Sequence, residues 1–462
     1  MMTLKKIVHC HLLMVAASLF CSQYALAAIP IEHWTQASGV KVYLVQSQTL
    51  PMVDVQIDFD AGGRRDPADQ AGLASVTASL TAKGVLASTR ASVAEPALDE
   101  NDLSEAWADL GASFDADASN DRMSFSLRSL TYPDLLGKAT QLAARQLGEP
   151  AFPQTIWLRE RERLNAALKE ANTRPATLVA RAFAAAVYGS HPYGFEMTQS
   201  TLARIDVADM QALYSRLILP CRAKVSIVGA VNRAQADGLV SQLFSRLTPL
   251  ATTPAACPAM PAVAEVAPLD KAVEQRIAFD SAQAHVLIGQ PGYKRNDPDF
   301  FALTVGNYIL GGGGFVSRLT NEVREKRGLS YSVYSHFEPG LHAGVFKLGL
   351  QTRPDQARQA VQVARDVVTD FVATGPTEVE LLAAKDNLIG GFALRIDSNR
   401  KLLANVANIA WNQLALDYLD TWTQQVQKVS AADIKAAFAR KLQPGKLVTV
   451  VLGAADAAKG SQ

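Results

Sequence analysis

Two side chains in the second half of the sequence could stabilise a developing negative charge. Arg324 and Tyr331 lie seven residues apart in the segment NYILGGGGFVSRLTNEVREKRGLSYSVYS. A guanidinium and a phenol can both donate hydrogen bonds to a substrate carbonyl oxygen as it becomes an oxyanion. The same two residues could instead form a surface ion pair and fill one face of a sheet. Their spacing alone does not decide between these roles.

A run of four glycines precedes this pair, directly after a helix predicted to end near residue 310. The run comprises Gly311, Gly312, Gly313 and Gly314. Because glycines carry no side chain, another backbone could approach closely and pair with their amides, as an added peptide strand would. A helix cap and turn would need only one glycine, and the lysine that ends a phosphate loop is missing. The run therefore favours contact with an extended peptide.

The elements that carry these residues belong to a duplicated plan. Segments 208–230 and 432–454 align without a gap at an offset of 224 residues, with Pro220 matching Pro444 and Gly229 matching Gly453. Each segment is predicted to form a helix that stops before the proline, followed by a β-branched strand. We interpret the chain as two copies of one domain.

Each copy mixes strands and helices without strict alternation. Residues 53–59 alternate apolar and polar side chains, which predicts a half-buried strand before a helix, and the segment that begins at residue 284 repeats this order. A hairpin is predicted to turn near Asn120 and Asp121, and helices over 132–147 and 154–171. The expected fold class is α+β: two homologous domains, each a mixed, mainly antiparallel sheet packed with helices.

A stretch rich in Pro, Ala and Thr, residues 248–270, has no clear periodicity and is predicted to be a linker. It separates a first domain, residues 28–247, from a second, residues 271–462. Cys221 and Cys257 are the cysteines that remain beyond residue 27. Sequence alone leaves open whether they form a disulfide.

The first 27 residues have the features of a secretory signal. Two lysines precede a short apolar run and a small-residue ending, so cleavage is expected near Ala27 and Ala28, and the protein is expected to be periplasmic or secreted. No later apolar run is long enough to span a bilayer. The formal net charge of +1 gives no indication of a nucleic-acid partner.

A strand is followed by AGGRRDPADQAGLA, then by AFAAAVYGSHPYG, then by the terminal helix-proline-strand unit, and a second such domain follows. This order of segments resembles the pitrilysin/insulinase-like zinc metallopeptidases, or inverzincins. The resemblance covers nearly the whole chain beyond the signal. In active members, His-x-x-Glu-His on the first-domain helix supplies two zinc ligands and a general base. This sequence has Ser75, Ala78 and Ser79 at those positions, which the resemblance identifies as a degenerate metal site.

Other candidate zinc ligands are sparse. The histidines beyond residue 27 include no pair four residues apart, and His191 is interpreted as a packing and turn residue. Glu160, Glu162 and Glu170 lie where the family has its third protein ligand, and we interpret them as a solvated helix face. We expect no metal or other cofactor in this chain, although an unconventional metal site stays open.

The resemblance gives Arg324 and Tyr331 a role. In the family, an arginine that ends a helix and a tyrosine on a strand face the zinc ion from across a chamber. In two-subunit members, one chain supplies the zinc ligands and the other this pair. The sequence therefore predicts a non-catalytic subunit of an exported peptidase, with a homologous zinc-bearing partner and a peptide substrate. Two alternatives stay open: a stand-alone periplasmic peptide-binding protein and a structural scaffold of the same fold.

Overall fold

The computed structural model describes residues 29–89, 94–247 and 257–453. The predicted signal segment, 1–27, lies outside the described residues, as does the part of the predicted linker that spans 248–256. Among the described helices, none has the length and apolar character needed to cross a bilayer.

The first half of the chain builds a six-stranded sheet with the order β1-β2-β6-β3-β5-β4. Only β2 and β6 run parallel to each other, and the other neighbours pair antiparallel. The turn between β4 and β5 lies at residues 119–122, where the sequence predicts a hairpin. The strands are β1 Glu32–Thr35, β2 Lys41–Gln46, β3 Met52–Phe59, β4 Ser113–Ala118, β5 Met123–Leu130 and β6 Lys224–Gly229.

The second half repeats this sheet with one strand fewer, in the order β7-β11-β8-β10-β9. Again one neighbouring pair, β7 and β11, is parallel and the rest are antiparallel. The prediction of an α+β fold with mixed, mainly antiparallel sheets is confirmed. The strands are β7 Val273–Ile277, β8 Ala284–Pro291, β9 Val333–Glu338, β10 Val345–Thr352 and β11 Val448–Leu452.

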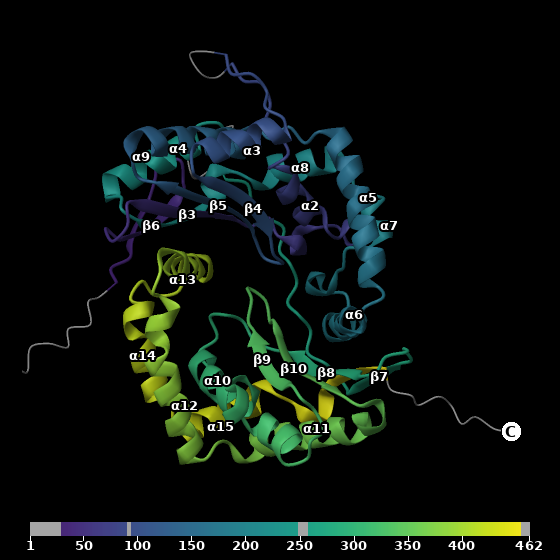
Figure 1. The fold of residues 1–462 in the computed structure, drawn as a ribbon. Coiled ribbons are helices and arrows are strands. Elements are labelled where there is room, and N and C mark those ends of the chain that lie inside the picture. Colours follow the sequence, from purple (N-terminus) through teal and green to yellow (C-terminus); the bar gives the residue numbers. More distant parts are fainter. Residues whose placement is uncertain (1–28, 90–93, 248–256, 454–462) are drawn as a thin grey trace, which may run out of the picture.

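Helices pack on both faces of each sheet (Figure 1). Those of the first half are α2 Leu73–Leu80, α3 Glu100–Asp109, α4 Pro133–Gly148, α5 Gln154–Ala171, α6 Pro175–Tyr188, α7 Gln199–Leu202, α8 Val207–Leu217 and α9 Arg233–Leu243. Those of the second are α10 Phe300–Asn307, α11 Ala357–Thr374, α12 Glu378–Gly390, α13 Asn399–Asn412, α14 Tyr418–Lys428 and α15 Ala431–Lys441. Reciprocal capping boxes start α8, at Asp206 and Asp209, and α15, at Ser430 and Asp433, again 224 residues apart.

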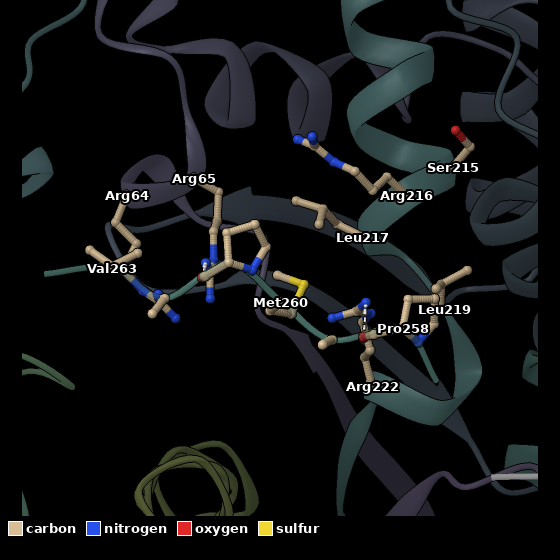
Figure 2. A pocket seen from close by; sticks show the side chains of 13 residues that line it. Arg64, Arg65, Ser215, Arg216, Leu217, Leu219, Arg222, Pro258, Met260 and Val263 are labelled. Carbon is tan, nitrogen blue, oxygen red and sulfur yellow. Dashed lines mark hydrogen bonds between the residues drawn. The ribbon is translucent and has the colours of Figure 1, made fainter. Parts of the chain in front are cut away.

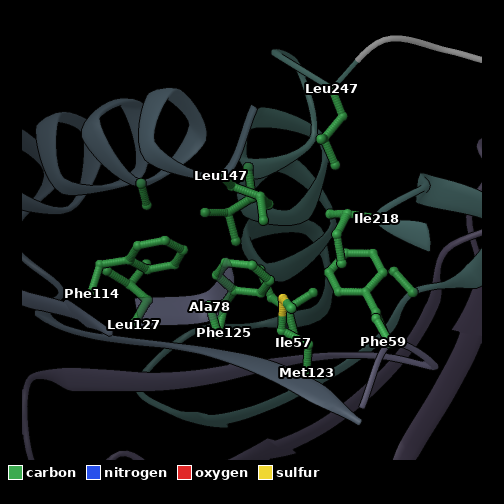
Figure 3. Packing of buried hydrophobic residues seen from close by; sticks show 14 of the residues in the cluster. Ile57, Phe59, Ala78, Phe114, Met123, Phe125, Leu127, Leu147, Ile218 and Leu247 are labelled. Carbon is green, nitrogen blue, oxygen red and sulfur yellow. The ribbon is translucent and has the colours of Figure 1, made fainter. Parts of the chain in front are cut away.

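Between the first sheet and its outer helices lies a core rich in aromatic rings (Figure 3). Phe59 of β3 and Phe125 of β5 are fully buried, with ring centroids 5.9 Å apart in an edge-to-face arrangement. Phe114 of β4 stacks on Phe125 at the same distance. Burial of such rings is the main favourable term for the layer.

Two helices are exchanged between the halves. Helix α6 of the first half packs on β8 and β11 of the second sheet, with Val179 and Phe183 buried in that contact. Helix α13 of the second half packs on β3 and β6 of the first sheet, with Val406 and Ile409 buried against it. The inner face of each sheet is therefore covered by a helix from the other half.

The predicted half-buried strand at 53–59 is wrong in one respect, because α13 covers its polar face. Asp54 and Asp58 of β3 are both buried. Asp54 is bound by Arg128 at 2.6 Å, and Asp58 by Arg122 at 3.0 Å. Alternation of apolar and polar residues indicates that the two faces differ, but it does not reveal that a distant helix covers the polar one.

The described part of the predicted linker, residues 257–270, crosses from one half to the other and is anchored along its length. Cys221 and Cys257 form a disulfide, which settles the question that the sequence leaves open. Further on, the Ala264 carbonyl lies 3.0 Å from Nε2 of His191. Nδ1 of that histidine accepts a hydrogen bond from the Tyr193 amide, in keeping with a turn residue.

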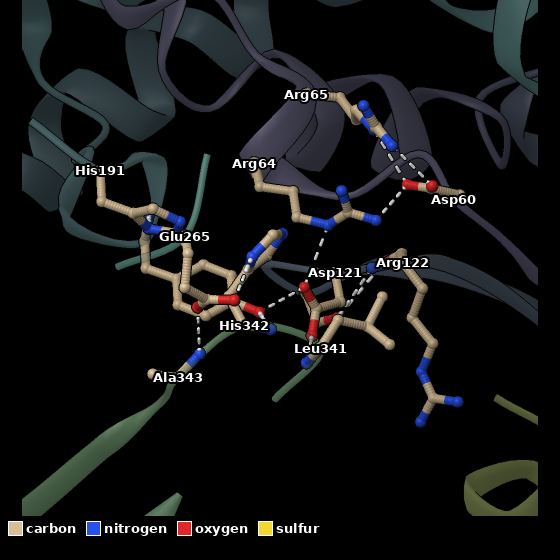
Figure 4. A network of polar contacts seen from close by, with 12 residues as sticks. Asp60, Arg64, Arg65, Asp121, Arg122, His191, Glu265, Leu341, His342 and Ala343 are labelled. Carbon is tan, nitrogen blue, oxygen red and sulfur yellow. Dashed lines mark hydrogen bonds and ion pairs between the residues drawn. The ribbon is translucent and has the colours of Figure 1, made fainter. Parts of the chain in front are cut away.

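A polar network joins the halves beside this segment (Figure 4). Asp121, in the β4–β5 turn, accepts hydrogen bonds from the Tyr193 hydroxyl at 2.6 Å and from the Leu341 amide at 3.0 Å. Glu265 accepts one from the Ala343 amide at 2.7 Å. Burial opposes ionisation of Glu265, but Lys294 and backbone amides outweigh it and lower its pKa to about 2. Glu265 is therefore ionised at neutral pH, and its hydrogen bond from Ala343 is charge-assisted.

The packing of α13 predicts a measurable coupling between the halves. Val406→Ala removes two methyl groups from a fully buried contact and should lower the free energy of unfolding by about 2 kcal/mol. Val379→Ala on α12 is the matched control, because its side chain is 79% exposed, and it should change stability by less than about 0.5 kcal/mol. Urea unfolding measures both. Equal effects of the two substitutions would contradict the exchanged-helix packing.

Candidate functional site

Arg324 and Tyr331 are brought together in the second half of the structure. Arg324 lies in the irregular helical turn Thr320–Glu325, near its end. Its guanidinium carbon is 4.6 Å from the centre of the Tyr331 ring. Tyr331 does not lie on a strand as the resemblance implies. It precedes β9 by two residues, in the bend that leads into the strand, and this places its ring out over the arginine.

A third side chain, which the sequence reasoning missed, completes this group. Phe315 directly follows the glycine run, and its ring centre is 4.7 Å from the same guanidinium carbon. Arg324 thus contacts two aromatic rings, and its Nε is 3.2 Å from Glu325. We call Phe315, Arg324 and Tyr331 the aromatic–arginine cluster. Each cation–π contact at an exposed site contributes roughly 0.5–1 kcal/mol.

The cluster is open to solvent. Tyr331 is 82% exposed, Phe315 71% and the neighbouring Val316 74%. Isolated exposed apolar residues are ordinary, but several large ones gathered around a cation indicate a contact surface. The sequence feature that could have identified Phe315 is its position directly after the glycine run.

Close contacts within the chain itself explain why glycines occupy this run. The helix ends close to the predicted residue: α10 ends at Asn307, and an irregular turn, Tyr308–Gly312, continues it through the first two glycines. A Cβ on Gly311 would lie 2.4 Å from Ser335 Oγ of β9, and one on Gly313 would lie 2.7 Å from the Tyr308 carbonyl oxygen. Gly314 has φ +62°, which favours glycine. The absence of a side chain at Gly311 therefore allows the protein's own strand β9 to pack closely against the run.

The polar groups of Ser335 on β9, which lies against Gly311, already have hydrogen-bond partners. The Asn307 side-chain amide donates a hydrogen bond to the Ser335 carbonyl at 3.0 Å and accepts one from Ser335 Oγ at 2.8 Å. That carbonyl therefore already accepts one hydrogen bond from within the chain. Gly312 and Gly314 are exposed and remain accessible to a guest backbone.

Helix α2 presents the predicted degenerate metal positions. Ser75 and Ser79 are exposed on one face, one turn apart, and Ala78 is buried. Two hydroxyls without an imidazole do not fit a zinc ion. Across the described ranges, no group of three or more His, Cys, Asp or Glu residues is placed to hold a metal.

The glutamates of α5 do not all form a solvated face as predicted. Glu162 and Glu170 are exposed, but Glu160 is buried. Glu160 is bound by Arg163 at 2.7 Å and by Arg159 at 3.1 Å. Burial opposes its charge, but the hydrogen bonds from these arginines outweigh it and lower its pKa. Glu160 is therefore an anion that two arginines already neutralise.

Known proteins share this architecture and part of this sequence. A sequence profile described as the peptidase M16 inactive domain matches residues 204–388. The crystal structure of a peptidase M16 inactive domain from Pseudomonas fluorescens has 31% sequence identity and a TM-score of 0.84, covering 91% of this chain and 97% of that one. The chain belongs to the M16 peptidase family. The resemblance to pitrilysin and insulinase is thereby confirmed.

Relatives in the M16 family include proteins with and without a peptidase name. An uncharacterized zinc protease of Streptomyces coelicolor is 28% identical over 57% of each chain. A non-peptidase homolog of Helicobacter pylori is 35% identical over 36% of this chain and 38% of its own. The alignments span about 57–63% of the length of the first curated relatives. A protease structure from Helicobacter pylori, at 20% identity and TM-score 0.81, shares the fold over 92% of this chain and 99% of that one.

Helix α2 is held in place by a buried carboxylate. Asp66 accepts hydrogen bonds from the Gly72 amide at 2.9 Å and the Ala74 amide at 3.0 Å. Burial raises its pKa to about 7, although these backbone bonds oppose the rise. An aspartate in the unfolded chain titrates near ~4. The stabilising contribution of Asp66 is therefore fully present below about pH 4 and is lost as pH rises to 7.

Asp66→Asn tests this linkage, because the amide stays neutral throughout. Between pH 5 and pH 8, the variant should gain about 2.5 kcal/mol of unfolding free energy relative to the unsubstituted protein. Urea unfolding at the two pH values measures the difference. Asp69→Asn, at an exposed position of the same turn, is the control and should show the same difference at both. A pH-independent difference for Asp66→Asn would overturn the assignment.

Proposed function

We propose that this M16 chain is a non-catalytic subunit of an exported, zinc-dependent peptidase, and that it contributes Arg324 and Tyr331 to the active centre of a zinc-bearing homologous partner. The observation that carries the proposal is the aromatic–arginine cluster, exposed on a chain whose helix α2 has hydroxyls at the family's histidine positions. Zinc would reside in the partner alone.

The geometry of Arg324 suits an oxyanion. Two rings contact the guanidinium and restrict its orientation, and the recorded ion pair uses only Nε. The two terminal nitrogens can then donate to a carbonyl oxygen that becomes negatively charged during attack. The exposed Tyr331 hydroxyl is a second donor beside it. Because the rings are already in contact, little side-chain entropy remains to be lost when the substrate binds.

The surroundings of the cluster suit an extended peptide. Phe315 and Val316 offer apolar surface to substrate side chains, and the exposed Gly312 and Gly314 leave room for a backbone to approach. We assign substrate contact to the glycine run on this ground, with Gly311 and Gly313 supporting the loop from within. Of the predicted site, Ser75, Ala78 and Ser79 would contribute no ligand.

Relatives support a subunit role and export. The alpha subunit of the mitochondrial-processing peptidase of Caenorhabditis elegans is 22% identical over 51% of this chain and 50% of its own. Its name describes a peptidase built from more than one chain. A periplasmic protease of Escherichia coli shares the fold with a TM-score of 0.74 at 19% identity, covering 92% of this chain and 45% of that one. Cleavage of the signal near Ala27 would place this protein in the same compartment.

The test is reconstitution with a homologous exported chain that carries an intact His-x-x-Glu-His, found by co-purification. The pair should cleave a fluorogenic peptide in a zinc-dependent reaction, and this chain alone should not. Arg324→Ala should lower kcat of the pair about 10²–10³-fold with a small change in KM, because the lost hydrogen bond acts mainly in the transition state. Tyr331→Phe should lower kcat about 10-fold.

Arg327→Ala is the matched control, since it removes an arginine from the same segment that is bound to Glu322 instead of the rings. It should leave turnover within about twofold. Zinc-dependent hydrolysis by the isolated chain would refute the proposal. Peptide binding that survives Arg324→Ala in the absence of any partner-dependent turnover would favour the stand-alone binding protein.

A further inference from the structure

A cavity of about 600 Å³ lies in the first half, away from the aromatic–arginine cluster (Figure 2). One wall is the C-terminal end of α8 and the turn that follows, and another is the helical turn Gly63–Arg65. The third wall is the segment 258–263, which crosses over them. The lining side chains are those of Arg64, Arg65, Ser215, Arg216, Leu217, Leu219, Arg222 and residues 258–263.

The cavity carries an excess of positive charge. Arg64 and Arg65 both bind Asp60, the latter through two nitrogens at 3.0 and 2.7 Å. Within residues 29–89, 94–247 and 257–453, no carboxylate forms an ion pair with Arg216 or Arg222. Four guanidinium groups thus line a space that has one carboxylate at its edge, and Arg64 reaches a second, Asp121, at 3.1 Å.

Arg222 has one hydrogen-bond partner for its guanidinium in the described structure. One terminal nitrogen donates a hydrogen bond to the Pro258 carbonyl at 2.6 Å. Its Nε is inaccessible to solvent and has no hydrogen-bond acceptor in the described structure. Burial lowers the pKa of Arg222, and Arg65 and Arg216 act in the same direction against the attraction of Asp60. Arg222 is half-buried and no carboxylate of the described residues forms an ion pair with it, so an anion bound in the cavity would give the guanidinium a charged partner.

The remaining lining is apolar. Leu217 and Leu219 are buried at the cavity wall, and Met260, Pro258 and Pro261 face them from the crossing segment. A cavity of this size with apolar walls and a few convergent polar groups is typical of a small-molecule site. Arginine pairs with carboxylates through two parallel hydrogen bonds, whereas apolar walls favour a hydrocarbon chain.

We propose that this cavity binds the carboxylate end of an apolar chain, with the carboxylate on Arg222, the charge of Arg216 adding to the positive potential, and the chain against Leu217, Leu219 and Met260. Two sources share this chemistry: a free medium-chain carboxylic acid, and the C-terminus of a short peptide that ends in apolar residues. The inference does not rest on the peptidase role, because none of these residues belongs to the aromatic–arginine cluster.

The disulfide prepares the site. Cys221 and Cys257 directly precede Arg222 and Pro258, the two residues that hydrogen-bond across the cavity. The cross-link therefore holds the crossing segment over the arginine before any ligand arrives, which reduces the ordering cost of binding. Reduction of the disulfide should lower the affinity for the ligand several-fold, because the crossing segment is then no longer held in place.

Isothermal titration of the whole protein with decanoate, decanol, and acetyl-Leu-Leu with a free or an amidated C-terminus tests the proposal. One of the two free carboxylates should bind with a Kd of about 10–300 µM, and the preferred one identifies the source. Decanol and the amidated peptide should bind at least tenfold more weakly. Equal binding of decanol and decanoate, or no binding of either carboxylate, would overturn the proposal.

Two variants locate the site. Arg222→Gln should weaken carboxylate binding at least tenfold. Arg216→Gln, whose side chain is exposed and whose replacement leaves the fold intact, should weaken it about two- to fivefold. Arg353→Gln is the matched control, because that exposed arginine lies outside the cavity, and it should bind as the unsubstituted protein does. Unchanged affinity in Arg216→Gln and in folded Arg222→Gln would place the carboxylate elsewhere and contradict the inference.

Discussion

The exchange of α6 and α13 between the two sheets is the constraint on which the rest of the structure depends. Each helix buries its apolar side on the sheet of the opposite half, so neither sheet is complete without the other half. The contact under α13 also contains buried charge. Lys224 of β6 donates to the Trp411 carbonyl at 2.8 Å and lies over its ring, and burial lowers the pKa of this lysine to about 8. Buried polar contacts of this kind are weak contributors to stability but restrict how the helix can sit.

This arrangement fixes where the functional groups can be. Helix α2 belongs to the first half and the aromatic–arginine cluster to the second, and the exchanged helices hold the two halves in one relative position. To separate them, the chain would expose Phe183 and Val406 to water and break the hydrogen bond from the Leu341 amide to Asp121. Apolar burial on this scale makes independent motion of the halves unfavourable.

Much of this could be predicted from the sequence where the signal was local. The 224-residue offset identified the paired helix and strand units, and the capping residues at Ser430 and Asp433 follow the same rule. The buried polar face of β3 and the exchanged helices could not be predicted, because amphipathic periodicity shows that a face is apolar without naming the surface that covers it. At the site, residue types predicted Arg324 and Tyr331, whereas the place of Phe315 depended on the path of the glycine loop.

The metal-ligand positions on α2 and the exposed rings beside Arg324 also differ in how they affect the stability of the fold. On α2, the core is filled by Leu73, Val76 and Leu80, and the ligand positions point outward, so serines at those positions leave the packing unchanged. The helix can therefore persist for structural reasons without metal chemistry. Phe315 and Tyr331 are in the opposite situation, since exposed rings contribute little to folding and favour non-specific association. Burial does not explain these two rings beside one arginine, and the proposed contact with a partner chain or a peptide rests on their exposure.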